Sequence, residues 1–439
     1  MKNLQKGDKK LLNAWAFYDW ANSVYTLTIA SAVFPIFYEA LFAKRDHYID
    51  VFGMHLKNSA LISFTTAFAF LVVSFISPLL SGIADYVGNK KAFMKFFCYL
   101  GALSCMGLYW FDLGNIYIGL AFYFLGLIGY WGSLVFYNSY LPDIAFEEQQ
   151  DRISAKGYSL GYIGSVILLV INLAMIMKPD WFRITGPEPA MKAMRYSFIM
   201  VGVWWVLFSQ YTYYYLPKGS KETGEKLTKS VVFNGFKELK KVWALLKENI
   251  PLKRYLGGFF VSSMAVQTVM LVATYFGAQE IQWSSKEEGT IGLIICILII
   301  QLVAVIGAVL TSRASAKFGN VPTLIVINAV WAVFCALAYF ITLPMHFYVM
   351  ATVAGFVMGG IQALSRSTYS KLLPETEDTA SFFSFYDVAE KIGIVIGMCV
   401  YGIIDQITGS PRAAIVILAV FFVTSIFLLR RVHKKELSK

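Results

Sequence analysis

The chain has 439 residues, of which 57% are hydrophobic, 16% aromatic and 15% charged, and its mean hydropathy is +0.59. Soluble domains average about 25% charged residues, so this composition excludes a soluble globular protein. The net charge of +11 would suit a nucleic-acid partner. However, roughly 28 Lys and Arg residues fall on one side of the predicted membrane spans, as the positive-inside rule expects for cytoplasmic loops. The basic excess therefore indicates topology and no nucleic-acid partner.

Apolar stretches fill the chain from Trp15 to Leu429. A hydrocarbon core takes about 20 apolar residues of helix, and the backbone must satisfy its own hydrogen bonds there. We therefore predict an all-α polytopic membrane protein with about twelve transmembrane helices. The predicted spans, in chain order, are residues 14–41, 59–83, 91–111, 115–139, 154–177, 195–216, 254–279, 289–312, 321–343, 346–369, 381–405 and 411–430.

The longest hydrophilic segment, residues 217–253, divides these spans into two equal sets. Within it, residues 230–249 carry apolar side chains at helical spacing against a lysine-rich face. This pattern predicts an amphipathic helix on the cytoplasmic membrane surface, with a plain linker helix as the alternative. We expect an N-terminal six-helix bundle over residues 1–216 and a C-terminal six-helix bundle over residues 254–439, with both termini in the cytoplasm.

The two halves of the chain are weak repeats of each other. Val87-Gly88-Asn89, after the second span, is echoed by Phe318-Gly319-Asn320, after the eighth. Leu141-Pro142-Asp143, after the fourth span, is echoed by Leu373-Pro374-Glu375, after the tenth. Because both halves start on the same side of the membrane, the repeat is parallel, as in the major facilitator transporters.

Residues 82–91 read Gly-Ile-Ala-Asp-Tyr-Val-Gly-Asn-Lys-Lys and resemble the major facilitator signature G-x-x-x-D-x-x-G-x-[RK]-[RK]. Gly88 permits a tight turn with positive φ. The resemblance implies that Asp85 accepts hydrogen bonds from the start of the eleventh span near Ser381 and latches the two halves in one state. An ordinary acidic loop residue is the alternative. The second-half copy has Ala316 in place of Asp85, so no symmetric second latch is expected.

Further segments resemble one branch of this superfamily, the vacuole-effluxer-like or unidentified major facilitator family. They include Trp15-Ala-Phe-Tyr-Asp19-Trp-Ala-Asn22-Ser23, Tyr137-Asn138-Ser-Tyr-Leu-Pro142-Asp143, Ser154-Ala-Lys-Gly157-Tyr-Ser-Leu-Gly161, Gly359-Gly360-Ile-Gln362-Ala-Leu-Ser365-Arg366-Ser367 and Phe382-Phe383-Ser-Phe-Tyr386. These segments run in family order along the whole chain. The resemblance implies two six-helix bundles and secondary transport. Its fungal members, tied to export of amino acids from the vacuole, suggest an amino-acid solute.

Ionisable groups inside membrane spans usually face a cavity or a partner. Asp19 lies near the start of the first span and Arg366 near the end of the tenth, on the same side of the membrane. They are expected to pair as a gate, with a permanent structural ion pair as the alternative. In this superfamily, spans 1, 4, 7 and 10 line the central path. The resemblance therefore implies that the substrate contacts Asn22, Tyr25, Asn138, Gln267 and Gln362.

Lys391 lies about ten residues into the eleventh span, roughly 15 Å deep at 1.5 Å per residue. Asp387 precedes it by one helical turn and Glu390 is its neighbour. Lys391 is expected either to hold a substrate carboxylate or to be neutralised by Asp387 in a structural ion pair. Glu390 is a candidate proton carrier, with Asp19 as its rival.

We expect a secondary transporter that moves a small polar organic solute by alternating access. Amino acids, efflux and proton coupling are favoured, and a sugar or glycoside carrier is the alternative. An integral-membrane lipid enzyme or a sensor is less favoured, because the sequence shows neither a catalytic cluster nor a soluble output domain. No catalytic residue, metal or cofactor is expected. The expected partners are the solute and the bilayer, and the protein is expected to be a monomer in the inner (plasma) membrane.

Overall fold

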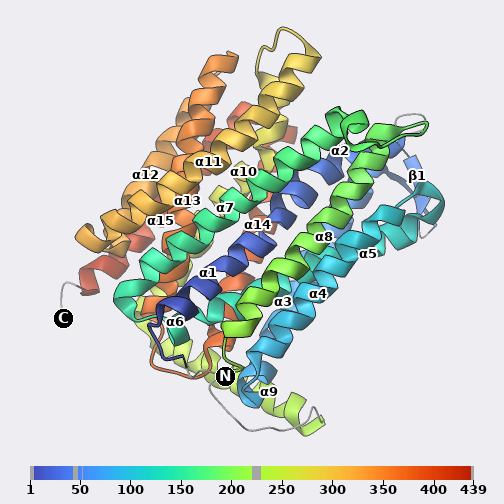
Figure 1. The fold of residues 1–439 in the computed structure, drawn as a ribbon. Coiled ribbons are helices and arrows are strands. Elements are labelled where there is room, and N and C mark those ends of the chain that lie inside the picture. The colour runs from blue at the N-terminus through green and yellow to red at the C-terminus, as the bar shows by residue number, and fades with distance from the viewer. Residues whose placement is uncertain (1–3, 43–47, 52, 220–228, 437–439) are drawn as a thin grey trace.

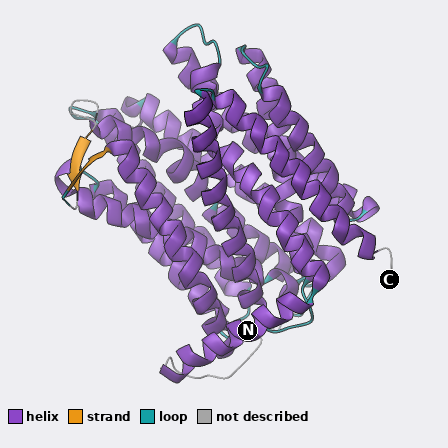
Figure 2. Ribbon diagram, turned by 180° about the vertical axis from the view of Figure 1, so that it is seen from behind, coloured by secondary structure: helices purple, strands orange, loops and turns teal. Residues whose placement is uncertain are grey.

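The computed structural model describes residues 4–42, 48–51, 53–219 and 229–436, and it is a bundle of long helices lying side by side (Figure 1). The predicted all-α class is confirmed, with one two-stranded hairpin added at an edge (Figure 2). The described chain ends lie at the same end of the bundle, here called the terminal face, and the hairpin lies toward the opposite face.

The elements follow one another along the chain as long rods joined by short turns. The first half contains α1 (Lys9–Asn22), the π-helix η1 (Tyr25–Ala32), α2 (Val33–Phe42), β1 (Tyr48–Val51), β2 (Met54–Lys57), α3 (Asn58–Val87), α4 (Lys90–Gly107), the 3₁₀ turns η2 (Leu108–Trp110) and η3 (Leu113–Asn115), α5 (Ile116–Ser139), α6 (Leu141–Ile144), α7 (Glu147–Met177), the 3₁₀ turn η4 (Pro179–Phe182) and α8 (Pro189–Tyr215). The second half contains α9 (Lys229–Glu248), α10 (Ile250–Glu280), α11 (Lys286–Phe318), α12 (Asn320–Ala338), α13 (Pro344–Leu372), α14 (Thr379–Thr408) and α15 (Pro411–Glu436).

Ten helical segments in the described residues are long and apolar enough to cross a membrane. Two more helices, α8 with 27 residues and α14 with 30, lie alongside them in the bundle (Figure 1). Both carry charged residues, among them Arg195 in α8 and Lys391 in α14, which lower their apolar content. Ten plus two gives the twelve spans predicted from the sequence.

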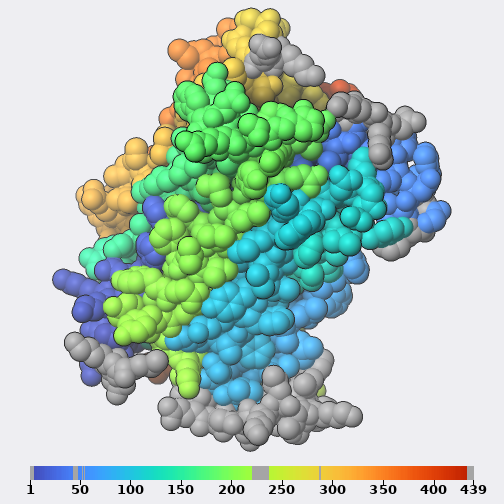
Figure 3. Space-filling view, turned by 45° about the vertical axis from the view of Figure 1, so that its right-hand side comes forward, coloured from blue at the N-terminus to red at the C-terminus, as the bar shows by residue number. Residues whose placement is uncertain are grey.

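The outer surface of the bundle is apolar, as contact with lipid requires. On the side formed by α4, α5 and α8 (Figure 3), Phe96, Leu103 and Leu207 are 60%, 60% and 63% exposed. A soluble protein seldom leaves so many large apolar side chains in water. The surface therefore agrees with a multi-pass membrane protein.

The first span departs from the single α-helix predicted over residues 14–41. It is α-helical to Asn22, π-helical over Tyr25–Ala32 and α-helical again from Val33. At the change of helix type, the Thr26 hydroxyl donates to the Ser23 carbonyl at 2.8 Å, and such back-bonding competes with the regular helix ladder. Segments of π-helix are frequent at functional sites.

Helix α9 lies across the terminal face (Figure 1), where an amphipathic surface helix was predicted. Its Val242 and Leu246 side chains are buried, and Lys241 donates to Glu238 at 2.9 Å and to Asp378 at 3.0 Å. These two hydrogen bonds raise the pKa of the Lys241 ammonium. The first part of the predicted apolar face, through residue 236, and the linker residues 220–228 lie outside the described side chains.

Two large apolar cores account for most of the buried apolar residues that the structure describes. One is built almost entirely from buried residues before Pro217, and the other almost entirely from residues after Glu238. This agrees with two bundles, although the predicted boundaries at residues 216 and 254 stay a prediction. Small residues bring the helices close together: a Cβ added at Gly359 of α13 would lie 2.0 Å from the Ala304 carbonyl oxygen of α11.

The Gly359→Ala substitution is expected to lower the free energy of unfolding by about 1–3 kcal/mol, because it must push α11 and α13 apart. Gly402→Ala on α14 is the matched control, since nothing lies within 4 Å of a Cβ at that position. Thermal melting of both variants in detergent tests this expectation. Equal melting temperatures for the two variants would contradict the close helix contact.

Candidate functional site

The deepest-buried arginine of the described chain, Arg366 on α13, crosses between the halves to reach α1. Its Nη1 and Nη2 atoms each lie 3.2 Å from Asp19 Oδ2, and the Tyr137 hydroxyl donates to the same oxygen at 2.8 Å. The side chains of Arg366 and Asp19 are 2% and 5% exposed. Arg366 also donates to the Ser154 hydroxyl at 3.0 Å and to Asn138 Oδ1 at 3.3 Å. The predicted pair is therefore present, although its gating role stays a prediction.

Aromatic rings and a glycine make room for this buried ion pair. The Arg366 guanidinium lies 4.8 Å from the Trp15 ring centroid and 4.2 Å from that of Tyr158, within the range of cation–π attraction. A Cβ added at Gly157 would lie 2.4 Å from Asp19 Oδ2. Only glycine at this position of α7 therefore lets Asp19 and Arg366 meet.

A second contact between the halves joins the end of α3 to the start of α14. Asp85 accepts hydrogen bonds from the Ala380 backbone N–H at 3.2 Å and from the backbone N–H and hydroxyl of Ser381, both at 2.7 Å. The first N–H groups of a helix have no partner within the helix and favour an anion. Asp85 therefore satisfies the start of α14 from the opposite half, and its role as a latch stays a prediction.

Lys90, two residues beyond the Gly88 turn, reinforces the same contact. Gly88 has φ of 69°, which turns the chain directly from α3 into α4. Lys90 is buried and donates to the Thr379 hydroxyl at 2.8 Å, and it also pairs with Asp143. The lysine thus joins α4 to the first residue of α14.

A third contact between the halves centres on Asp151 of α7, which the sequence analysis missed. Asp151 accepts from the Ser315 hydroxyl at 3.0 Å, Asn320 Nδ2 at 2.8 Å and Lys371 Nζ at 2.7 Å. Ala316 supplies no acid to this turn, as the sequence showed, but the acid comes from the other half. The contact is therefore not the symmetric copy of the Asp85 contact, because the acid comes from α7 of the first half.

The titratable cluster predicted on α14 is present and closely paired. Lys391 is fully buried, and its Nζ lies 2.5 Å from Asp387 Oδ1 and 3.0 Å from Glu390 Oε2. It also lies 3.6 Å from the centroid of the Trp131 ring on α5. Gln267, predicted to touch substrate, donates to Glu390 Oε1 at 2.8 Å. Lys391 stands 12 residues after Thr379, which is about 18 Å along the helix and so near mid-membrane.

The remaining predicted substrate residues are Gln362 on α13 and Asn22 and Tyr25 on the first span. Gln362 Oε1 accepts from the Tyr162 hydroxyl of the opposite half at 2.6 Å. Asn22 is fully buried and Tyr25 is 1% exposed, and the Asn22 Nδ2 and Tyr25 hydroxyl have no hydrogen-bond partner among the described residues. These two groups on the first span are free to bind water or a ligand.

The hydrogen bonds described here between the halves all lie between the terminal face and Gln362. Gln362 stands about 15 Å from the end of α13 at Leu372. Toward the opposite face, Leu271 and Tyr275 of α10 are 47% and 67% exposed. The hydrogen bonds between the halves therefore extend from the terminal face to mid-membrane.

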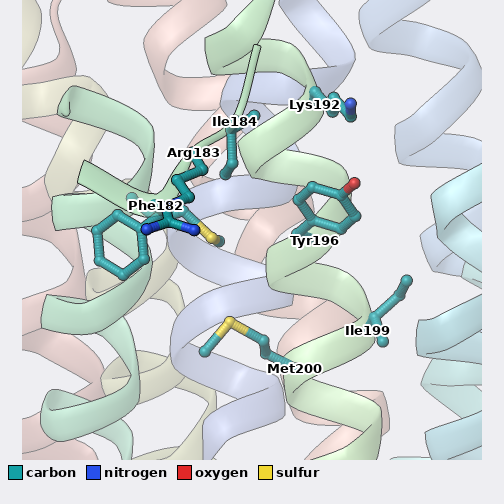
Figure 4. Close-up of a pocket in the computed structure, with 8 residues that line it drawn as sticks. Phe182, Arg183, Ile184, Lys192, Tyr196, Ile199 and Met200 are labelled. Carbon is teal, nitrogen blue, oxygen red and sulfur yellow. The ribbon is translucent and has the colours of Figure 1, made fainter. Parts of the chain in front are cut away.

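One cavity of about 460 Å³ lies away from these residues, near the opposite face. It is lined by residues of α7, η4, α8 and the loop between η4 and α8, and Figure 4 shows Arg183, Lys192 and Tyr196 among them. All its lining residues belong to the first half, and none is a predicted site residue. The candidate site is therefore the buried polar path and not this cavity.

Known proteins resemble this chain along most of its length. A family model described as "Vacuole effluxer Atg22 like" matches residues 7–437. The "Uncharacterized MFS-type transporter YxiO" of Bacillus subtilis (strain 168) is 30% identical over 433 residues, which are 97% of this chain and 95% of that protein. "Autophagy-related protein 22-2" of Aspergillus oryzae is 22% identical over 460 residues, which are 84% of this chain and 74% of that protein.

The fold also resembles that of a solved transporter. The crystal structure of the major facilitator superfamily transporter FucP in the outward conformation matches 96% of this chain and 98% of that chain, with a TM-score of 0.69 and 14% identity. At this identity the likeness concerns the fold alone.

Proposed function

Because the chain belongs to the Atg22-like family of vacuole effluxers, as its motifs predicted, and is a major facilitator transporter, we propose that it exports amino acids in exchange for protons. The observation that carries the proposal is the buried Lys391–Asp387–Glu390 cluster at mid-membrane. Charges at this depth are costly and are typical of solute or proton pathways. The two acidic groups of the cluster suit the ammonium group that every amino acid carries.

Alternating access assigns a role to each contact between the halves. The contacts of Asp85, Asp151 and Arg366 join the halves on the terminal side, so opening that side requires all three to break. We take the terminal face as cytoplasmic, which follows the excess of Lys and Arg there. On this assignment the structure is the state closed to the cytoplasm. We further propose that the protein is a monomer in the plasma membrane.

Counterflow in proteoliposomes tests the proposed substrate class, because this assay needs no ion gradient. Vesicles loaded with a mixture of amino acids are expected to accumulate external labelled amino acid, and vesicles loaded with hexoses are not. Exchange of sugars and not of amino acids would overturn the proposal. A sugar carrier would need aromatic rings near the path that can stack on the sugar ring, and Trp131 and Tyr275 are the candidates. The Trp131 face is occupied by Lys391 and Tyr275 is 67% exposed, so the site gives the sugar alternative no support.

The Asp85→Asn substitution is expected to favour opening of the terminal face by about 10- to 100-fold, since it weakens hydrogen bonds to a charged acceptor worth about 1.5–3 kcal/mol. A cysteine at Ala380, whose side chain is buried, should then react faster with a membrane-impermeant maleimide, in a Cys399→Ser background. Asp50→Asn on the exposed hairpin is the control. Unchanged labelling together with full transport would remove the latch from the mechanism.

A further inference from the structure

The charges of the α14 cluster do not balance. Lys391 carries one positive charge, and Asp387 and Glu390 carry two negative charges. Three of the four carboxylate oxygens are engaged: Asp387 Oδ1 and Glu390 Oε2 by Lys391, and Glu390 Oε1 by Gln267. The fourth, Asp387 Oδ2, is buried and has no hydrogen-bond partner among the described residues.

Lys391 has no donor left for a substrate carboxylate in this state. A lysine ammonium has three N–H donors. The ammonium of Lys391 meets Asp387, Glu390 and the face of Trp131, at 2.5, 3.0 and 3.6 Å respectively. A carboxylate brought to Lys391 would also meet two like charges. The cluster can therefore bind a further positive charge, and it cannot bind a further carboxylate.

An unpartnered carboxylate oxygen away from water is costly, and the cost is removed by a cation or a proton. The aromatic faces nearby are already occupied, that of Trp131 by Lys391 and that of Tyr158 by Arg366. A positive charge that enters here is therefore bound by the excess carboxylate of the cluster.

The other charged groups near the cluster are already paired. On α13, Arg366 is bound to Asp19. On α3, Asp85 is bound at Ser381, six residues before Asp387. From α10 the cluster meets the neutral Gln267. None of these groups neutralises Asp387 in the structure as it stands.

We propose that Asp387 Oδ2 binds the protonated amine of the transported solute, and that this amine and a proton occupy the carboxylate in turn. This rests on the proposed function and names both the recognised group and the coupling. When the ammonium binds, the proton on Asp387 leaves to the aqueous side from which the solute came. When the ammonium leaves, a proton takes its place. With either the ammonium or a proton bound, the charges of Lys391, Asp387, Glu390 and that cation sum to zero. Because the two occupy Asp387 in turn, solute and proton cross in opposite directions.

Three probes of matched shape test which end of the solute is recognised. They are valine, isobutylamine, which lacks the carboxylate, and 3-methylbutanoate, which lacks the amine. Binding is measured to the full chain in nanodiscs by calorimetry in two buffers of different ionisation enthalpy, which also counts released protons. Isobutylamine is expected to bind within about tenfold of valine and to release one proton, and 3-methylbutanoate is expected to bind at least about 100-fold more weakly, as loss of an ion pair implies.

Asp387→Asn should weaken isobutylamine binding by about 10- to 100-fold and abolish proton release, because it removes the excess negative charge. Asp405→Asn, on the same helix and outside the cluster, should change neither. Isobutylamine that fails to bind, or that binds Asp387→Asn as well as the unmodified protein, overturns the proposal. So does 3-methylbutanoate binding as tightly as valine. If isobutylamine behaves as expected and amino acids show no counterflow, the cation site stands and the amino-acid function fails.

Discussion

Arg366→Ala is expected to abolish transport and to lower the free energy of unfolding by about 3–5 kcal/mol. The substitution leaves Asp19 buried without its cation, and only the Tyr137 hydroxyl still donates to that carboxylate. It also leaves the Ser154 and Asn138 oxygens without their guanidinium donor. Thermal melting and counterflow of the same preparation measure both effects.

A double variant that replaces both charges with neutral side chains distinguishes a gate from a structural ion pair. In the Asp19→Asn/Arg366→Gln double variant, no charge is buried alone, so the melting temperature should recover most of the loss. If the pair is a gate, transport should stay impaired, and a cysteine at Ala155 beside Ser154 should become reactive from the terminal side. Recovery of both stability and transport would assign the pair a structural role. A stable, fully active Arg366→Ala variant would contradict both.

Lys391→Ala is expected to reduce transport by more than about 100-fold, because it leaves the buried Asp387 and the partly buried Glu390 without a cation. The side chains of Asp387 and Glu390 are 7% and 18% exposed, so water compensates little. Initial rates at several pH values in proteoliposomes measure the loss.

Glu390→Gln disturbs the same cluster less than Lys391→Ala does. It keeps the size of the side chain and its contact with Gln267, and it leaves one carboxylate for Lys391. Exchange should therefore fall less than in Lys391→Ala, and its dependence on the pH gradient should weaken because the excess negative charge is gone. Normal transport by Lys391→Ala would make the cluster structural and move the site to Asp19 and Arg366.

The fold could be predicted from the sequence because the solvent imposes it. Apolar stretches of about 20 residues without polar interruption can only be helices in lipid. The contact of Asp85 with Ser381 was implied by the family resemblance, and that of Asp19 with Arg366 could be anticipated from the residues. A charge inside a span must find a partner, and few partners exist at the same depth.

The parts that could not be predicted depend on distances between segments remote in sequence. Asp151 lies in an acidic first stretch of α7 that reads as a solvated helix start, yet it meets Lys371 across 220 residues. Nothing in the spacing of Tyr25–Ala32 marks a π-helix, because its side chains still suit a helix surface. The saturation of Lys391 by two acids and Trp131 likewise appears only when α5 and α14 are packed together.

The opening of the terminal face is the central requirement of the account, and paired spin labels measure it directly. Labels at the exposed residues Glu148 and Lys317 span the halves at the terminal face, and labels at Trp181 and Phe340 span them at the opposite face. Double electron–electron resonance in nanodiscs is recorded for the unmodified protein and for Asp85→Asn. The account predicts that the first distance lengthens and the second shortens together in Asp85→Asn. Distances that stay the same at both faces, or that lengthen at both, would contradict rocking of one bundle against the other.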